Sequence, residues 1–245
     1  LFLLEKEKGY NLSKTTVGLV GVGHVGHAVI EAIRPLGVQI LLNDPPQKEA
    51  LRKAGKPHEF FLKMEELQEK CDIISFHTPL ITKGPYPTFH LANKTFFNAL
   101  KKQPIIINTS RGAVVDNTDV LQALKDGIIR DAIIDTWENE PNINQELLNL
   151  IYIGTPHIAG YSADGKANAT RMALTALCNH FHLPVTFQIR VPQLPEEELP
   201  EPNLTETERA LVLYNPHTDS LKLKSHPTMF EELRGNYPLR REFIE

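Results

Sequence analysis

The amino-acid sequence predicts an α/β fold, in which helices cover both faces of a parallel β-sheet. Between residues 17 and 153, short apolar runs recur, and stretches rich in helix-forming residues separate them. Continuous apolar runs are typical of strands buried on both faces, and alternation with helices produces a parallel, doubly wound sheet. The first run also ends in three closely spaced glycines, which predict what this sheet binds.

These glycines form the pattern Gly21-x-Gly23-x-x-Gly26 between a strand and a helix. Gly21 allows the tight turn, Gly23 lets the backbone approach a pyrophosphate, and Gly26 lets the helix pack closely on the strand. The helix starts near His24 and Val25, so its free N–H groups would face the phosphates. The pattern therefore predicts a Rossmann-type dinucleotide site.

An acidic residue at the end of the second strand indicates which dinucleotide binds. Asp44 lies 18 residues past Gly26, where its carboxylate can accept hydrogen bonds from both ribose hydroxyls. The 2′-phosphate of NADP would repel that carboxylate, and no Arg follows in residues 45–47. We therefore predict NAD as the cofactor.

The remaining elements follow from apolar runs and helix signals. Strands are expected at residues 17–20, 38–42, 60–62, 72–77, 105–108, 131–135 and 151–153. Helices are expected at residues 28–36, 48–54, 63–70, 93–100, 117–125 and 164–181, and Thr205 to Glu208 reads as a capping box that starts another.

Composition limits the classes of function. The net charge of −4 offers no electrostatic attraction to nucleic acid or to an anionic membrane, and no apolar run is long enough to span a bilayer. The two cysteines, Cys71 and Cys178, form neither a metal-binding nor a disulfide framework. We therefore expect a cytoplasmic protein without a metal site, a nucleic-acid partner or a membrane partner.

Polar residues with catalytic chemistry follow four of the predicted strands. They are Thr78, Ser110-Arg111-Gly112, residues 135–140 and residues 155–161. The carboxyl ends of parallel strands meet at one edge of a sheet, where ligands bind. Hydride transfer from an alcohol needs a proton acceptor, which suits His, and a cation for the anionic part of the substrate, which suits Arg.

Three of these strand ends resemble the signature sequences of the NAD-dependent D-2-hydroxyacid dehydrogenases. They read Asn108-Thr-Ser-Arg-Gly112, Asp135-Thr-Trp-Glu-Asn-Glu-Pro141 and Thr155-Pro-His-Ile-Ala-Gly160, in the family's order after the glycines. The resemblance implies that Arg111 binds the substrate carboxylate. It also implies that His157 accepts and donates the proton, and that Glu140 pairs with this histidine.

The same resemblance implies further contacts. The positions that match cofactor contacts are Thr78, Ser110, Asp135 and Gly160. Tyr161 matches a substrate-binding tyrosine in relatives whose substrate is a small phosphorylated 2-hydroxy acid. Trp137 is interpreted as a packing residue.

The resemblance also suggests a domain organisation. Residues 1–14 form an incoming helix or linker, 15–160 the NAD-binding domain, 161–189 a helix that returns to the substrate domain, and 190–245 a C-terminal module. This module is expected to be a small α+β unit that joins two copies into a homodimer. In the family, most of the substrate domain precedes the NAD-binding domain, and that segment is absent from the sequence given.

Two alternatives stay open at this point. The protein could be another member of the family, acting on phosphoglycerate, glycerate or glyoxylate. It could also be a non-catalytic NAD-sensing protein similar to the transcriptional corepressors of the family, which keep the same Arg, Glu and His. Turnover of a hydroxy acid separates the second alternative from an enzyme.

Overall fold

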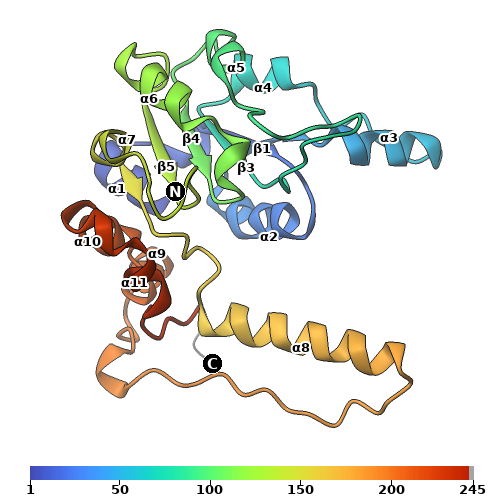
Figure 1. Ribbon diagram of the computed structural model, residues 1–245, viewed down its shortest axis with the longest axis vertical. Helices are drawn as coiled ribbons and strands as arrows, with labels where there is room; N and C mark the ends of the chain where they lie inside the picture. Colours follow the sequence, from blue (N-terminus) through green and yellow to red (C-terminus); the bar gives the residue numbers. More distant parts are fainter. Residues whose placement is uncertain (243–245) are drawn as a thin grey trace.

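The computed structural model describes residues 1–242, so the last three residues of the predicted C-terminal module, 243–245, lie outside the described residues. Within residues 1–242, the strands form one parallel sheet in the order β2-β1-β3-β4-β5-β6 (Figure 1). They are β1 (Thr16–Val20), β2 (Gln39–Asn43), β3 (Ile73–Phe76), β4 (Ile105–Asn108), β5 (Asp131–Ile134) and β6 (Ile153–Gly154). This confirms the predicted doubly wound α/β fold.

The order of the strands creates a crevice. The chain runs from β1 outward to β2, then crosses back past β1 to β3 and continues to β6. The connections that follow β1 and β3 therefore leave the sheet in opposite directions, and a ligand can bind between them. The glycine pattern follows β1, so it lies at this point.

Helices cover both faces of the sheet. On one face, Ile74 and Ile106 pack in a core that includes residues of α4 (Met64–Lys70), α5 (Lys94–Asn98), α6 (Asn117–Lys125) and α7 (Gln145–Leu150). On the other face, Ile73 and Ile105 pack with residues of α1 (Phe2–Lys8), η1 (Leu12–Lys14), α2 (His24–Ile33) and η2 (Arg34–Leu36). Successive strand residues point to opposite faces, which is why neighbouring isoleucines belong to different cores.

Most sequence-based expectations agree with these elements, and the differences have local causes. The candidate strand at residues 60–62 forms only an isolated bridge, between Phe61 and Leu42 of β2. The helix expected at 48–54 is α3 (Pro45–Lys53), which starts earlier because Asp44 caps it. Helix α7 was not expected; the side chain of Asn144 accepts from the backbone N–H of Leu147 and starts it.

The C-terminal segment contains η4 (Glu196–Glu198), α9 (Glu206–Leu213), α10 (Pro216–Ser225), η5 (Pro227–Met229) and α11 (Phe230–Gly235). No strand occurs in the part of residues 190–245 that the structure describes, so the α+β composition expected there is wrong for those residues. The prolines of residues 191–202 have no backbone N–H to donate to a neighbouring strand. After this stretch, the side chains of Thr205 and Asn215 cap the starts of α9 and α10.

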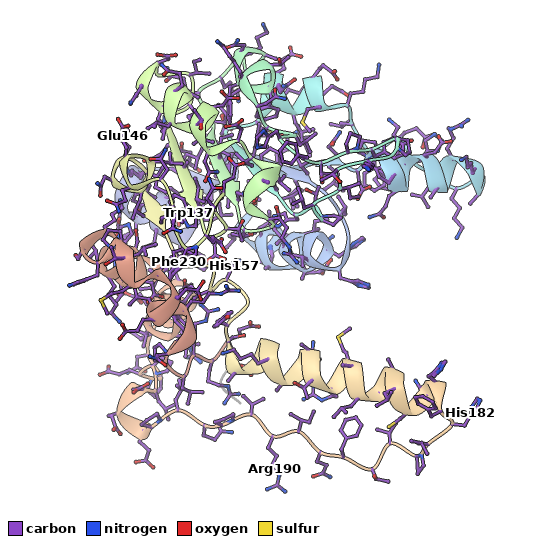
Figure 2. All side chains as sticks on the ribbon, in the orientation of Figure 1. Trp137, Glu146, His157, His182, Arg190 and Phe230 are labelled. Atoms are coloured by element: carbon purple, nitrogen blue, oxygen red, sulfur yellow. The ribbon has the colours of Figure 1, made fainter. Side chains whose placement is uncertain are left out.

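This segment packs directly on the domain that contains the sheet. Leu223 of α10 and Phe230 of α11 are completely buried in the same core as Trp137. Figure 2 labels Phe230 and Trp137. The backbone N–H of Gly154 in β6 donates to the Ser220 hydroxyl at 3.0 Å, and Lys224 donates to the carbonyl of Ile151. The edge of the sheet at β6 is therefore covered by α10.

Helix α8 (Ala163–His180) and the extended chain after it project away from the rest of the molecule (Figure 1). We call residues 163–204 the arm. Its large apolar side chains are exposed: Met172, Leu177, Phe181, Leu183 and Val185 are each at least half accessible. An apolar surface of this kind is typical of a face that contacts another protein surface.

Candidate active site

The glycine loop has the geometry that a pyrophosphate requires. Gly21 has φ +90°, and a Cβ there would lie 2.7 Å from the His77 carbonyl oxygen. A Cβ on Gly26 would collide with the carbonyl oxygen of Gly21. A Cβ on Gly23 would meet open space, so its absence leaves room for a ligand at the start of α2, where His24 and Val25 are exposed. The loop thus fits the dinucleotide predicted from sequence.

Asp44 lies at the end of β2, as predicted, and braces the glycine loop. Its carboxylate accepts the backbone N–H of Val22 at 2.8 Å and that of Gln47 at 2.9 Å. The side-chain amide of Gln47 also donates to Oδ2 at 2.9 Å, so Oδ2 accepts two hydrogen bonds, and Oδ1 keeps one lone pair for a ribose hydroxyl. The side chain is therefore anchored beside the loop with its acceptor capacity only partly used.

Two buried polar atoms lie beside the same loop, after β3. Among the described residues, neither the Thr78 hydroxyl nor Nδ1 of His77 has a hydrogen-bond partner. Unpaired buried polar atoms are rare and indicate a site for a ligand or water. Their position next to Gly21 fits NAD, and Thr78 was the residue predicted from sequence. Burial also lowers the pKa of His77 to about 4, so its ring is neutral at pH 7.

The loop that carries Arg111 is built around Asn108, which is completely buried at the end of β4. The Asn108 amide donates to the carbonyl of Arg111 at 3.0 Å and accepts from the Ser110 hydroxyl at 2.9 Å. The guanidinium of Arg111 is exposed and donates to the Ser110 carbonyl. Ser110 therefore shapes this loop, and a contact between its buried side chain and the cofactor stays a prediction.

Gly112 brings the Arg111 loop against the loop that follows β5. A Cβ on Gly112 would collide with the carbonyl group of Trp137. Trp137 is buried, as expected for a packing residue, and its indole N–H donates to the carbonyl of Thr155 at 2.9 Å. Its backbone N–H donates to Oε1 of Glu140 at 2.7 Å. The loops with Arg111 and Glu140 are therefore in direct contact.

His157 and Glu140 form the closest pair of titratable groups predicted from sequence. Nδ1 of His157 lies 2.8 Å from Oε2 of Glu140. An ionised carboxylate only accepts, so Nδ1 carries the proton and Nε2 is free to take another. The His157 side chain is 29% accessible, and Figure 2 shows it on the side of the sheet that faces α8. This is the geometry of a general base held in one tautomer.

Two charged residues hold the peptide units that follow His157. Asp135, which is 3% accessible, accepts the backbone N–H groups of Ile158 and Ala159 and the Thr155 hydroxyl. Burial raises the pKa of Asp135. Arg240 of the C-terminal segment donates to the carbonyls of Ile158 and Ala159 at 3.0 and 2.8 Å. Through these hydrogen bonds Asp135 holds residues 155–161, the histidine loop, in place. A contact between Asp135 and the cofactor stays a prediction.

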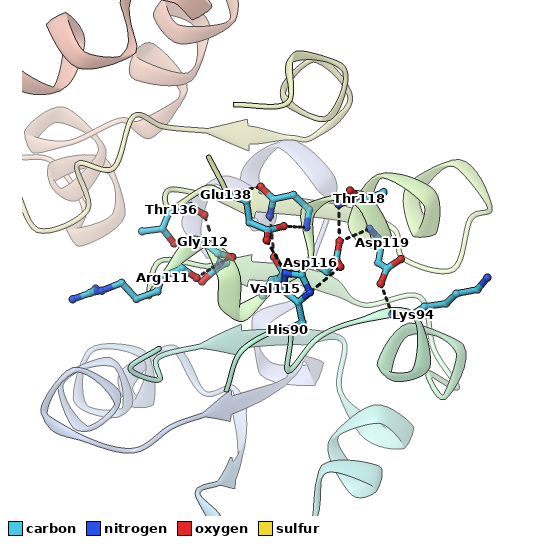
Figure 3. A network of polar contacts seen from close by, with 12 residues as sticks. His90, Lys94, Arg111, Gly112, Val115, Asp116, Thr118, Asp119, Thr136 and Glu138 are labelled. Atoms are coloured by element: carbon cyan, nitrogen blue, oxygen red, sulfur yellow. Dashed lines mark hydrogen bonds and ion pairs between the residues drawn. The ribbon is translucent and has the colours of Figure 1, made fainter. Parts of the chain in front are cut away.

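A second histidine, His90, links the loops of Arg111 and Glu140 through its two ring nitrogens (Figure 3). The ring nitrogens of His90 face Glu138 Oε1 at 2.6 Å and Asp116 Oδ2 at 3.1 Å. The other oxygen of Glu138 accepts the backbone N–H of Asn117. His90 therefore links the segment after Arg111 to the segment before Glu140, and sequence reasoning gave it no role because its partners are distant in sequence.

Tyr161 and Gly160 complete the predicted set. Gly160 is exposed, beside the braced residues. The backbone N–H of Tyr161 donates to the carbonyl of Ile158 at 2.9 Å. The ring of Tyr161 meets that of Tyr237 edge-on, with centroids 6.1 Å apart. The predicted substrate-binding tyrosine thus lies where the histidine loop meets the C-terminal segment.

Comparison with known proteins agrees with this geometry. Residues 4–159 match the family model described as D-isomer specific 2-hydroxyacid dehydrogenase, NAD binding domain. The erythronate-4-phosphate dehydrogenase of Bacteroides fragilis is 50% identical over 242 residues, which are 99% of this chain and 68% of that protein. The protein of the same name from Bacteroides thetaiotaomicron is 52% identical over 227 residues, which are 93% of this chain and 63% of that protein.

The chain therefore spans about two thirds of the length of these curated relatives. Among solved structures, the D-lactate dehydrogenase of Aquifex aeolicus, complexed with NAD and lactic acid, superposes with a TM-score of 0.57 at 26% identity. The match covers 71% of this chain and 55% of that chain.

Within residues 1–242, no helix is both long enough and apolar enough to cross a bilayer.

Proposed function

This chain belongs to the D-isomer specific 2-hydroxyacid dehydrogenase family and takes NAD as its cofactor, and we propose that the full-length protein oxidises 4-phospho-D-erythronate. The product would be 2-oxo-3-hydroxy-4-phosphobutanoate, in the synthesis of pyridoxal 5′-phosphate (vitamin B6). The observation that carries the chemistry is the contact between His157 and Glu140 at 2.8 Å beside the Arg111 loop. The names of the relatives from Bacteroides support the choice of substrate.

The glycine loop, Asp44, Thr78 and the exposed start of α2 would hold the cofactor. When bound, NAD supplies the nicotinamide that accepts hydride from C2 of the substrate. The glycine loop and the residues that follow β4 and β5 lie at the same edge of the sheet, so a dinucleotide held at the glycine loop would lie along that edge. The histidine loop, which includes Gly160, follows β6 at the same edge.

His157 takes the proton of the substrate hydroxyl on Nε2 while the C2–H bond breaks. Glu140 accepts from Nδ1, so it fixes the tautomer and stabilises the imidazolium that forms. The exposed guanidinium of Arg111 binds the substrate carboxylate through two N–H groups and polarises the oxygen on C2 as the carbonyl forms. In the reverse direction, His157 returns the proton.

Residues 190–245 would also join two copies into a homodimer. Leu199, Val212 and Leu221 of this segment are exposed and could contribute apolar contacts to such an interface, whereas the exposed apolar side chains at residues 172–185 lie in the segment expected to return to the substrate domain. A monomeric mass of the full-length protein in solution would contradict this. The free cysteines Cys71 and Cys178 support a reducing compartment, and we propose a cytoplasmic location.

The test of the proposed activity compares substrates on the full-length protein. We expect kcat/KM for 4-phosphoerythronate to exceed that for 3-phosphoglycerate, glycerate and glyoxylate, with a 2-oxo acid supplied as a possible means of reoxidising NADH. The His157→Ala variant should lose activity by orders of magnitude while it still binds NAD. A preference for phosphoglycerate would keep the chemistry and reject the substrate. No turnover of any hydroxy acid would favour an NAD-sensing protein.

A further inference from the structure

Two cationic side chains lie beside the ring of Tyr161. Nζ of Lys166, in the first turns of α8, lies 4.3 Å from the ring centroid. Cζ of Arg234, in α11, lies 5.8 Å from the same centroid. The two cations come from segments that are far apart in sequence and meet at this tyrosine. Both distances are within the range of cation–π contacts, which place positive charge beside the ring.

The charge of this pair is not neutralised by the acidic residues around it. Among the side chains that the structure describes, which do not include that of Glu206 or those of residues 243–245, neither Lys166 nor Arg234 forms an ion pair. The acid nearest in sequence to Lys166, Asp164, is bound by Arg241 at 2.9 Å.

On the side of Arg234, Asp219 accepts the hydroxyl of Tyr237 at 2.7 Å, and the two glutamates of α11, Glu231 and Glu232, are exposed. Nε of Arg234 is buried and has no hydrogen-bond partner among the described residues. A buried N–H of a guanidinium without an acceptor is costly, and because this N–H is inaccessible, an anion would be bound through the terminal N–H groups of the guanidinium.

The position of Tyr161 connects this pair to the reacting group. Tyr161 follows His157 by four residues and is tied to Ile158, whose backbone is held by Asp135 and Arg240. These hydrogen bonds hold the backbone of Tyr161 at a constant place relative to His157, and the two cations lie beside the ring of that tyrosine. A substrate whose carboxylate is bound by Arg111 extends its other end away from that arginine.

We propose that Lys166, Arg234 and the hydroxyl of Tyr161 form the subsite for the phosphate of the substrate. This rests on the proposed function, because it assigns the group that holds the end of the molecule opposite its carboxylate. The guanidinium offers two parallel N–H donors to phosphate oxygens, and the ammonium adds a compact charge. Tyr161 contributes one hydroxyl donor, and both cations lie within cation–π distance of its ring.

The experiment measures kcat/KM of the full-length protein for 4-phosphoerythronate and for erythronate, which lacks the phosphate. In Lys166→Gln and Arg234→Gln, we expect kcat/KM for the phosphorylated substrate to fall by about 10- to 100-fold, mainly through KM, since charged hydrogen bonds have contributions of this order. Turnover of erythronate and the affinity for NAD should not change. Arg171→Gln, an exposed cation of the same helix, is the control and should behave as the wild type.

Equal losses on both substrates would assign a structural role to these residues and overturn the subsite, as would unchanged values on both. Lys166→Arg keeps the charge and should keep most of the preference for the phosphorylated substrate. If the wild type prefers 3-phosphoglycerate, the proposed function fails, and the same comparison with glycerate still tests the subsite. If the wild type turns over no phosphorylated hydroxy acid, both proposals are rejected.

Discussion

Asp135 and Arg240 bind the same two residues from different parts of the chain: Asp135 accepts the N–H groups of Ile158 and Ala159, and Arg240 donates to their carbonyls. Both side chains are less than 10% accessible. Four hydrogen bonds with charged groups therefore hold the backbone immediately after His157. The position of the proposed base depends on a residue of the C-terminal segment as well as on the sheet.

Replacement of Arg240 by Gln should lower kcat by about 100-fold, since small displacements of a catalytic group have effects of this size. It should also lower the free energy of unfolding by about 2 kcal/mol, because the buried carbonyl of Ile158 and the partly buried carbonyl of Ala159 lose a charged donor. Steady-state kinetics and urea unfolding measure the two effects. Arg190→Gln, on the arm, should change neither. A variant with normal kcat would show that Asp135 alone holds the loop.

Replacement of Gly112 by Ala should abolish most activity and lower the stability of the protein. The new methyl would overlap the Trp137 carbonyl, so the Arg111 loop must move away from the loop of Glu140. Gly235→Ala is the matched control, because a Cβ there meets open space. We expect a loss of at least about 1 kcal/mol in thermal or urea unfolding for the first variant only. Equal behaviour of the two variants would contradict the close approach of these loops.

His77 should make stability depend on pH between about 6.5 and 4. Its pKa is lowered to about 4 by burial, so in this window the unfolded chain binds a proton that the folded chain does not. The neutral His77 ring makes its full contribution to the free energy of unfolding above the unfolded pKa of about 6.5. This contribution is lost as the pH falls from about 6.5 to about 4. The difference in unfolding free energy between the wild type and His77→Gln should change by up to about 3 kcal/mol across this window. If the difference in unfolding free energy between the two proteins does not depend on pH, the His77 ring is not held neutral by burial.

Replacement of His90 by Ala should lower kcat more than it changes the affinity for NAD. The variant removes the link between Asp116 and Glu138, and the loops of Arg111 and Glu140 lose a fixed spacing. His217→Ala, which removes a histidine that faces Glu7 on another part of the chain, is the control. If the His90→Ala variant loses thermal stability while its kcat stays unchanged, His90 stabilises the fold and does not position the catalytic loops.

The sheet could be predicted because its strands are apolar on both faces and end in recognisable residues. Arg111, Glu140 and His157 follow β4, β5 and β6, so the topology alone brings them to one edge. The supporting contacts could not be predicted in the same way. Arg240 reaches Ile158 across 82 positions in the chain, and no local pattern indicates which carbonyls a distant arginine will bind.

The C-terminal segment shows the same limit. The capping box at Thr205 correctly predicts the start of α9. Helix α10 begins after Asn215, whose side chain caps it, and its packing on β6 depends on the burial of Leu223 in the core. Local sequence determines the ends of such helices, but which surface they cover is decided by burial.

The contact between Ser220 and Gly154 has a consequence for how copies of this chain can associate. An outer strand normally presents unpaired N–H groups that invite strand addition and aggregation. Here β6 has two residues, its Gly154 N–H is bound by a side chain, and α10 occupies the adjoining space. Two molecules therefore cannot merge their sheets through β6, and an assembly that uses this end of the molecule must be built from helices.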